Sequence, residues 1–304
     1  MSRIKFVGLH AHSLSIFDSI GYPSEHYDSC YENGGTSLAI TDHGHMNAVP
    51  YQISHSKIMN DNGKSFKPLF GAEMYFNHSI LEWAKERDKF RNEKSKKKIK
   101  KTGVEIELMD SSLDEENSLV IEDENTSKSE IKNVLNERRH LILLAQNQVG
   151  LNNLYKLVSL SYTGDNFYRF PRIDFDLLKK YNDGLICLTA CQGGPLFGCY
   201  WKNMINGKDA IYKSMVDLSK QFLSIFQNRF YGELQWNSSK DQMIGNQMIL
   251  DVAKDLGFKT VSTCDSHYPK REQWLSRILY KKLGWLNKNK EDKSLPDNID
   301  DVRL

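Results

Sequence analysis

The sequence is poor in cysteine. Its 304 residues include five cysteines, an odd number, and no two of them form a CxxC pair. So sparse a set does not build a disulfide framework, and it is typical of a protein that keeps free thiols in a reducing compartment. One of these thiols would then be available as a metal ligand. The cysteine usage therefore favours a cytoplasmic protein.

Long hydrophobic runs and an excess of one charge are also missing. No stretch approaches the roughly 20 apolar residues that cross a bilayer, and residues 1–5 lack the apolar core of a signal peptide. The 41 basic and 39 acidic residues leave a net charge of only +2. Because overall attraction is this weak, any affinity for nucleic acid must come from local patches. A membrane partner is not expected.

Apolar runs alternate with segments of helical pattern along most of the chain. A hydrophobic share of 39% is enough for a core, and this alternation predicts an α/β fold of parallel strands. Strands are predicted at 4–8, 38–41, 68–72, 140–145, 184–190, 230–235 and 258–263. Helices are predicted at 24–33, 49–59, 152–162, 176–180, 207–226 and 241–256.

Residues 78–139 break this alternation. Basic residues crowd 85–101, and acidic residues then dominate 105–124. Separate blocks of opposite charge with few aromatics usually form a solvated segment, so we expect a charged, mobile insertion. The alternative is that the lysine run contacts a phosphate backbone.

Two histidines follow the first predicted strand. Since side chains in an extended chain alternate with a period of two, His10 and His12 point to the same side. Together they could hold one metal ion, with Asp18 as a nearby oxygen ligand. Taken alone, a His-x-His pair is a weak signal, and a pair of exposed histidines just after an edge strand is the favoured alternative.

Several later strands also end in potential ligands, namely His43, Glu73, Cys191, and Asp265 with His267. In a barrel of parallel strands, the carboxyl ends share one rim, where active sites form, so these side chains should converge. His140 is the exception, because it begins its apolar run and the pattern offers no reason for that position.

Imidazole, carboxylate and thiolate ligands together suit zinc, with manganese or iron as alternatives. Nine candidates exceed the need of one tetrahedral ion, so a bridging carboxylate and two or three ions are expected. Closely spaced ions activate water and neutralise phosphate oxygens, as in phosphoester hydrolysis. The competing interpretation is that each residue merely caps a strand or serves the core.

The ordered series of these residues resembles the PHP (polymerase and histidinol phosphatase) domain. Four sequence motifs are similar to those of the N-terminal PHP domain of bacterial and phage DNA polymerase III alpha subunits of the C-family. They are residues 71–75, 140–145, 171–174 and 265–268. The resemblance covers roughly 4–270 apart from the insertion. It implies a distorted (β/α)7 barrel formed by 1–77 and 140–270, with 78–139 inserted and 271–304 as a C-terminal tail.

The resemblance also implies a trinuclear centre of zinc or manganese ions. The first ion would take His10, His12, Glu73 and Asp265. The second would share Glu73 and take His140 and Cys191. The third would take Asp18, His43 and His267.

With this full set of ligands, the resemblance implies a metal-dependent phosphoesterase, foremost a 3′–5′ exonuclease on DNA in replication, with no catalytic group beyond the metal-bound water. Its partners would be DNA 3′ ends and the polymerase core or other replisome subunits. One alternative is an inactive domain that metals brace within a polymerase, and another is a pyrophosphatase or small-molecule phosphatase. No segment could house nucleotidyl transfer, so we expect a fragment, a split gene product or a free-standing PHP protein.

Three further residues have weaker predictions. His45 and Arg172 are predicted to bind substrate phosphate. The alternative for His45 is a solvent-facing histidine, and the alternative for Arg172 is a structural anchor beside Pro171. Glu233 ends a predicted strand and would either orient a ligand or bond to neighbouring backbone.

Overall fold

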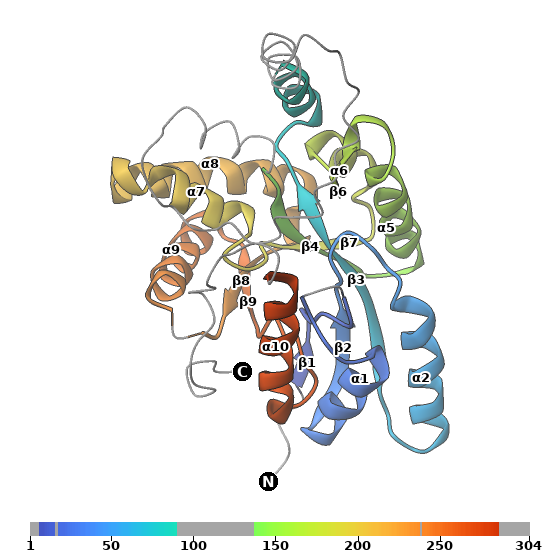
Figure 1. The fold of residues 1–304 in the computed structure, drawn as a ribbon. Helices are drawn as coiled ribbons and strands as arrows, with labels where there is room; N and C mark the ends of the chain where they lie inside the picture. Colours follow the sequence, from blue (N-terminus) through green and yellow to red (C-terminus); the bar gives the residue numbers. More distant parts are fainter. Residues whose placement is uncertain (1–5, 16–17, 90–136, 238, 286–304) are drawn as a thin grey trace, which may run out of the picture.

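The computed structural model describes residues 6–15, 18–89, 137–237 and 239–285. Its centre is one sheet that curls into a nearly closed barrel (Figure 1). The strands, in their order across the sheet, are β1 (Phe6–Gly8), β2 (Gly35–Ile40), β3 (Lys67–Phe76), β4 (Arg139–Ala145), β7 (Leu185–Leu188), β8 (Phe230–Gln235) and β9 (Lys259–Thr263). The predicted α/β barrel is confirmed.

The two edge strands meet only beyond their ends. Ala11 and Ser266 form a parallel bridge, and the backbone N–H of His12 donates to the Ser266 carbonyl at 2.8 Å. This seam closes the barrel at the rim where β1 and β9 end. The segments that carry His10, His12 and Asp265 are thereby held side by side.

Strand β4 runs antiparallel to both β3 and β7, whereas all other neighbours in the sheet are parallel. The prediction of a wholly parallel barrel is wrong at this strand. An antiparallel strand starts at the edge where its neighbour ends, and His140 accordingly pairs with Tyr75 near the end of β3. His140 therefore reaches the common rim from the start of its strand.

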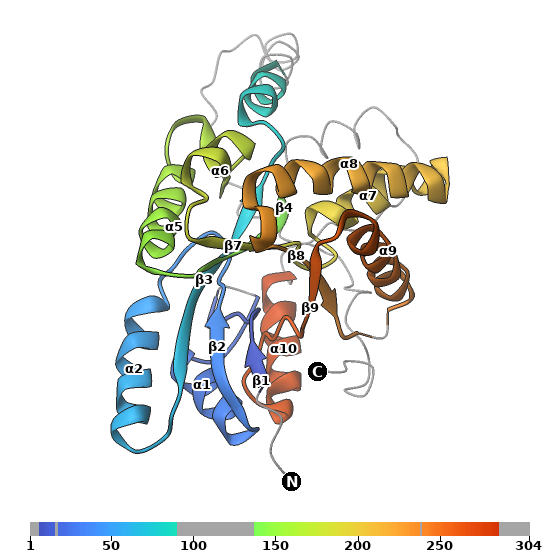
Figure 2. The same cartoon turned by 180° about the vertical axis from the view of Figure 1, so that it is seen from behind.

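Helices cover the outside of the barrel (Figure 2). They are α1 (Pro23–Glu32), α2 (Val49–Asp61), α5 (Gln148–Ser161), α6 (Phe175–Tyr181), α7 (Pro195–Asn203), α8 (Lys208–Phe226), α9 (Lys240–Leu256) and α10 (Trp274–Trp285), with residues 80–89 also helical. Helix α5 starts earlier than predicted, because the Asn147 side chain accepts a hydrogen bond from the Gly150 N–H and caps it. No helix in the described ranges is long and apolar enough to span a bilayer.

Shorter elements join these parts. They are the two-stranded sheet of β5 (Phe167–Tyr168) and β6 (Phe170–Pro171), and the 3₁₀ turns η1 (Gly164–Asn166), η2 (Met204–Asn206), η3 (Gln227–Arg229) and η4 (Arg271–Gln273). Most of the predicted insertion, residues 90–136, and the end of the predicted tail, residues 286–304, lie outside the described residues.

The main hydrophobic core lies between the sheet and the helices. Leu141 and Leu143 of β4 are fully buried there with Leu154 of α5 and Phe222 of α8. The alternate residue Ile142 belongs to a smaller cluster with Leu188 of β7. The two-residue period of the strand thus separates the apolar outer face from the interior, where the polar rim residues gather.

Candidate metal centre

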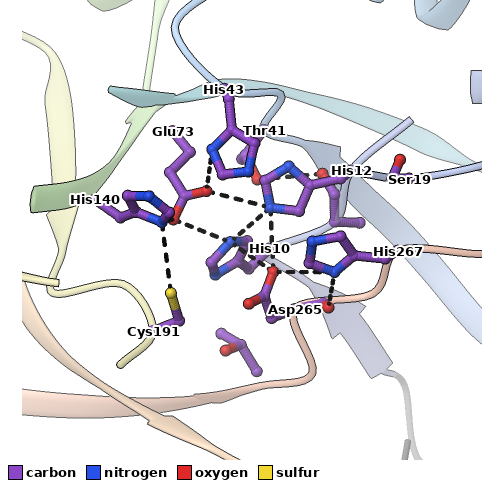
Figure 3. Close-up of polar contacts among 12 residues, drawn as sticks. His10, His12, Ser19, Thr41, His43, Glu73, His140, Cys191, Asp265 and His267 are labelled. Atoms are coloured by element: carbon purple, nitrogen blue, oxygen red, sulfur yellow. Dashed lines mark hydrogen bonds and ion pairs between the residues drawn. The ribbon is translucent and has the colours of Figure 1, made fainter. Parts of the chain in front are cut away.

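The structure brings all nine predicted ligand residues together at one rim of the barrel. Figure 3 labels eight of them, all except Asp18. Eight lie on a strand or just beyond its end: His10 and His12 after β1, His43 after β2, Glu73 in β3, His140 in β4, Cys191 after β7, and Asp265 and His267 after β9. Asp18 comes from the loop between β1 and α1. Strands fix most of the site because their ends cannot move without disturbing the sheet.

Four side chains direct their ligand atoms at one point. His10 Nε2 and His12 Nε2 lie 3.1 Å apart, and each is 3.1 Å from Asp265 Oδ1. Glu73 completes the group, with Oε2 3.3 Å from His12 Nε2 and Oε1 3.6 Å from His10 Nε2. These are the residues that the resemblance assigns to a first ion.

The Glu73 carboxylate also faces residues outside this group. Its Oε1 is 3.1 Å from His140 Nδ1, and that nitrogen is 3.6 Å from Cys191 Sγ. Its Oε2 is 2.8 Å from His43 Nδ1. Glu73 therefore contacts residues of the other two predicted ligand groups as well as those of the first.

Asp18 forms the third side of the cluster. Its Oδ2 is 3.3 Å from His43 Nε2, and its Oδ1 is 3.5 Å from His267 Nε2. The ring of His12 lies 4.5 Å, between centroids, from the rings of both His43 and His267. The third group thus adjoins the first, and His12 lies between them.

The buried carboxylates need positive charge. Glu73 is 1% exposed, and neither of its oxygens has a hydrogen bond of good geometry, as is also true of Asp265 Oδ1. Burial alone would raise the pKa of Glu73, but His140, His43 and His10 hold it well below its usual value. A buried carboxylate without a cation costs several kcal/mol. Protons on the imidazoles can supply that charge, and so can metal ions, which this donor set fits.

A second carboxylate orients His10 from inside the barrel. Glu233 is fully buried, and its Oε1 lies 2.6 Å from His10 Nδ1 and 2.5 Å from Thr263 Oγ1. With Nδ1 donating to Glu233, His10 presents Nε2 to the cluster, as metal-binding histidines commonly do. Of the two predicted roles for Glu233, the geometry favours orientation.

Asp42 is a supporting residue that sequence reasoning missed. It is 2% exposed and accepts hydrogen bonds from the backbone N–H and the hydroxyl of Ser13, both at 2.7 Å. It thereby fixes the chain that follows His12. Its place beside His43 was the available signal, but only the fold shows that both of its carboxylate oxygens bond to Ser13.

The backbone is strained where two strands deliver their ligands. Ala190, before Cys191, has φ 58°, and Asp265 has φ 54°, both in the left-handed region that side chains other than glycine rarely adopt. Such a conformation costs about 1–3 kcal/mol and persists where the surroundings enforce it.

The predicted phosphate-binding role of Arg172 does not fit the structure. Its side chain is fully buried, and Nη1 donates to the carbonyls of Tyr168 at 2.7 Å and Phe170 at 2.9 Å. Its guanidinium lies 4.2 Å from the centre of the Trp83 ring, and burial lowers its pKa to about 9. Arg172 therefore anchors the β5–β6 hairpin, as the alternative interpretation expected.

His45 keeps its access to solvent. It is half-buried, and burial lowers its pKa, with the charges of His43 and His12 acting in the same direction. An imidazole next to the cluster can donate or accept a hydrogen bond. Its predicted contact with substrate stays a prediction.

The PHP domain family profile matches residues 8–237. The DNA polymerase III subunit alpha of Borreliella burgdorferi is 30% identical over 295 residues, 96% of this chain and 21% of that protein. The same subunit of Aquifex aeolicus is 30% identical over 265 residues, 86% of this chain and 18% of that protein. The chain thus spans about a fifth of the length of these curated relatives.

A solved amidohydrolase structure from Chromobacterium violaceum aligns with a TM-score of 0.44 and 10% sequence identity, covering 90% of this chain and 96% of that chain. This likeness is too weak to support a conclusion about activity.

Proposed function

The chain belongs to the PHP domain family, and we propose that it is a metal-dependent phosphoesterase that removes nucleotides from DNA 3′ ends. The observation that carries the proposal is the position of Glu73. Its carboxylate is 1% exposed and faces imidazoles of all three ligand groups. A core would not gather four histidines around one buried acid for stability alone, because such groups are costly to desolvate.

The nine clustered residues would hold three ions, which we propose to be zinc or manganese. Bound ions of this kind supply an activated water and neutralise charge that develops on phosphate. Glu73 would join two ligand groups, and Glu233 would keep Nε2 of His10 directed at the cluster. No side-chain nucleophile is needed for this chemistry. His45, at the edge of the cluster, would donate a hydrogen bond to the terminal phosphate.

DNA is the proposed substrate because the relatives described above are named DNA polymerase III subunit alpha. The chain corresponds to about a fifth of those proteins, so a polymerase core or another replisome subunit is the proposed partner. The phosphodiester at a DNA 3′ end would approach from the rim, where His45 keeps its exposure.

The test is release of mononucleotides from 3′-labelled DNA in the presence of zinc or manganese. His12→Ala should lose nearly all activity, because His12 contacts both carboxylates of the first group. His55→Ala is the matched control, since that histidine pairs with Asp28 at 3.1 Å on the helices outside the barrel. Equal rates for wild type and His12→Ala would contradict the proposal.

The other two candidate functions are separate outcomes of the same experiment. Release of phosphate from pyrophosphate or sugar phosphates, with no cleavage of DNA, would identify a small-molecule phosphatase. A metal-braced structural domain would turn over none of these substrates, yet chelation would lower its melting temperature.

A further inference from the structure

Asp18 differs from the other eight clustered residues in how it is held. Strand β1 ends at Gly8, and Asp18 lies well beyond it in the loop that leads to α1. The backbone N–H of Asp18 reaches the Ser15 carbonyl only at 3.5 Å, and the Ser15 hydroxyl reaches Asp18 Oδ2 at the same distance. A carboxylate on such a loop needs a support from elsewhere if it is to occupy one position.

That support comes from the C-terminal helix. The Arg277 Nε donates to the Asp18 carbonyl at 3.0 Å, and Nη2 lies 3.9 Å from Asp18 Oδ1. Helix α10 lies beside β1 and β9, along the seam of the barrel (Figures 1 and 2). Ile278 is 7% exposed and Lys281 is 9% exposed, so this helix is packed against the molecule and can hold Arg277 in place.

We propose that Arg277 is a positioning residue that holds the Asp18 carboxylate in the metal centre, which makes α10 one of the supports of that centre. The inference rests on the proposed function, because it assumes that Asp18, His43 and His267 take a divalent cation. Fixing the loop in advance removes conformational entropy that metal binding would otherwise have to overcome. Arg277 lies beyond residue 237, where the family match ends.

The hydrogen bond, rather than the positive charge, should account for this role. A guanidinium next to a bound cation repels it, so the charge alone would weaken metal binding. Glutamine places its Nε2 the same number of bonds from Cα as the Nε of arginine, so Arg277→Gln can keep the bond to the Asp18 carbonyl. Lysine keeps the charge but has a methylene at that position. Arg277→Gln should therefore bind metal more nearly like wild type than Arg277→Lys does.

The experiment measures metal content and affinity with zinc and with manganese alone, using elemental analysis after dialysis and titration against a chelator. Arg277→Ala should weaken one class of sites by about 10- to 100-fold, the usual effect of losing a residue that orients a ligand. Lys282→Ala, an exposed residue of the same helix, is the matched control and should bind as wild type does.

A double-mutant cycle identifies the route of the effect. If Arg277 acts through Asp18, then Arg277→Ala should cause no further loss in an Asp18→Ala background. Three outcomes would each overturn the inference. They are wild-type metal affinity in Arg277→Ala, additive losses of affinity in the double variant, and better rescue by lysine than by glutamine. If the alanine variant does not fold in metal-free buffer, the comparison of glutamine with lysine still decides.

The two proposals fail in different ways. A wild-type protein that shows this dependence on Arg277 but hydrolyses no phosphoester would leave the inference standing and remove the proposed function. A wild-type protein that binds neither cation would remove both.

Discussion

Burial of side chains has opposite effects on folding free energy at the two faces of the barrel wall. The outer face carries Leu141 and Leu143, which are fully buried against helices and contribute roughly 1.5–3 kcal/mol each. At the rim, the inner face carries Glu73, whose burial costs free energy unless cations surround it. The comparison teaches that stability and the candidate chemistry are separated by the alternation of side chains along single strands. Variants of the two faces should therefore fail in different assays.

Loss of the central carboxylate should have the largest effect. Glu73→Gln keeps the shape of the side chain but removes the charge that joins the ligand groups. We expect metal content and hydrolysis to fall by orders of magnitude. The variant should still unfold cooperatively in EDTA, because the amide keeps the shape of the side chain. Elemental analysis, the nucleotide-release assay and thermal unfolding with and without EDTA provide the check.

The outer face should show the reverse pattern. Leu143→Ala leaves a cavity in the main core, and the free energy of unfolding should fall by about 2–5 kcal/mol. Metal content per folded molecule should stay at the wild-type value, because the side chain of Leu143 points away from the cluster. Denaturant titration gives the first quantity. A large loss of metal from folded Leu143→Ala would break the comparison.

Substitution of Glu233, which bonds to His10, should give a smaller effect that is confined to metal binding. In Glu233→Gln, the amide can still bond to His10 Nδ1 but loses the charge that makes Nε2 a stronger ligand. Metal affinity should fall by about 10- to 100-fold, with little change in unfolding free energy. Gln247→Glu, on the solvent side of α9, is a control for a change of one charge.

The pH dependence of the metal-free protein should be the mildest test. The lowered pKa values of Glu73 and Asp265 add stability that is lost as pH falls through those values. The raised pKa values of His10 and His43 add stability that is complete below about 6.5 and lost as pH rises through them. In EDTA these four groups should therefore contribute most to stability between about pH 4.5 and 6.5, whereas the lowered pKa values of His26 and His267 act against stability below about pH 6.5.

Metal should move that optimum upward, because ligands must lose their protons to bind it. Thermal unfolding at several pH values with saturating zinc measures the shift. An unchanged optimum would show that the charge of the cluster does not respond to metal.

Strand positions explain why sequence reasoning found most of the candidate site. His12, His43 and Asp265 follow apolar runs, and the rule that parallel strands share a rim places them together. The same rule had no place for His140, because direction in a sheet depends on which strands pair, and β4 pairs antiparallel on both sides. For Arg172 the sequence predicted a site residue that the structure places elsewhere, since a charged residue beside a proline gave no sign of its complete burial.

The order of apolar runs and the residue types at their ends are local properties, so the sequence alone determined the α/β class, most strand and helix positions and the set of nine candidate ligands. The resemblance to the PHP domain, confirmed by the family match, rests on those same motifs. Only the tertiary structure decided the reversed strand, the orientation of His10 by Glu233 and the contact of Arg277 with Asp18. These depend on distances between residues far apart in the chain, which no local pattern encodes.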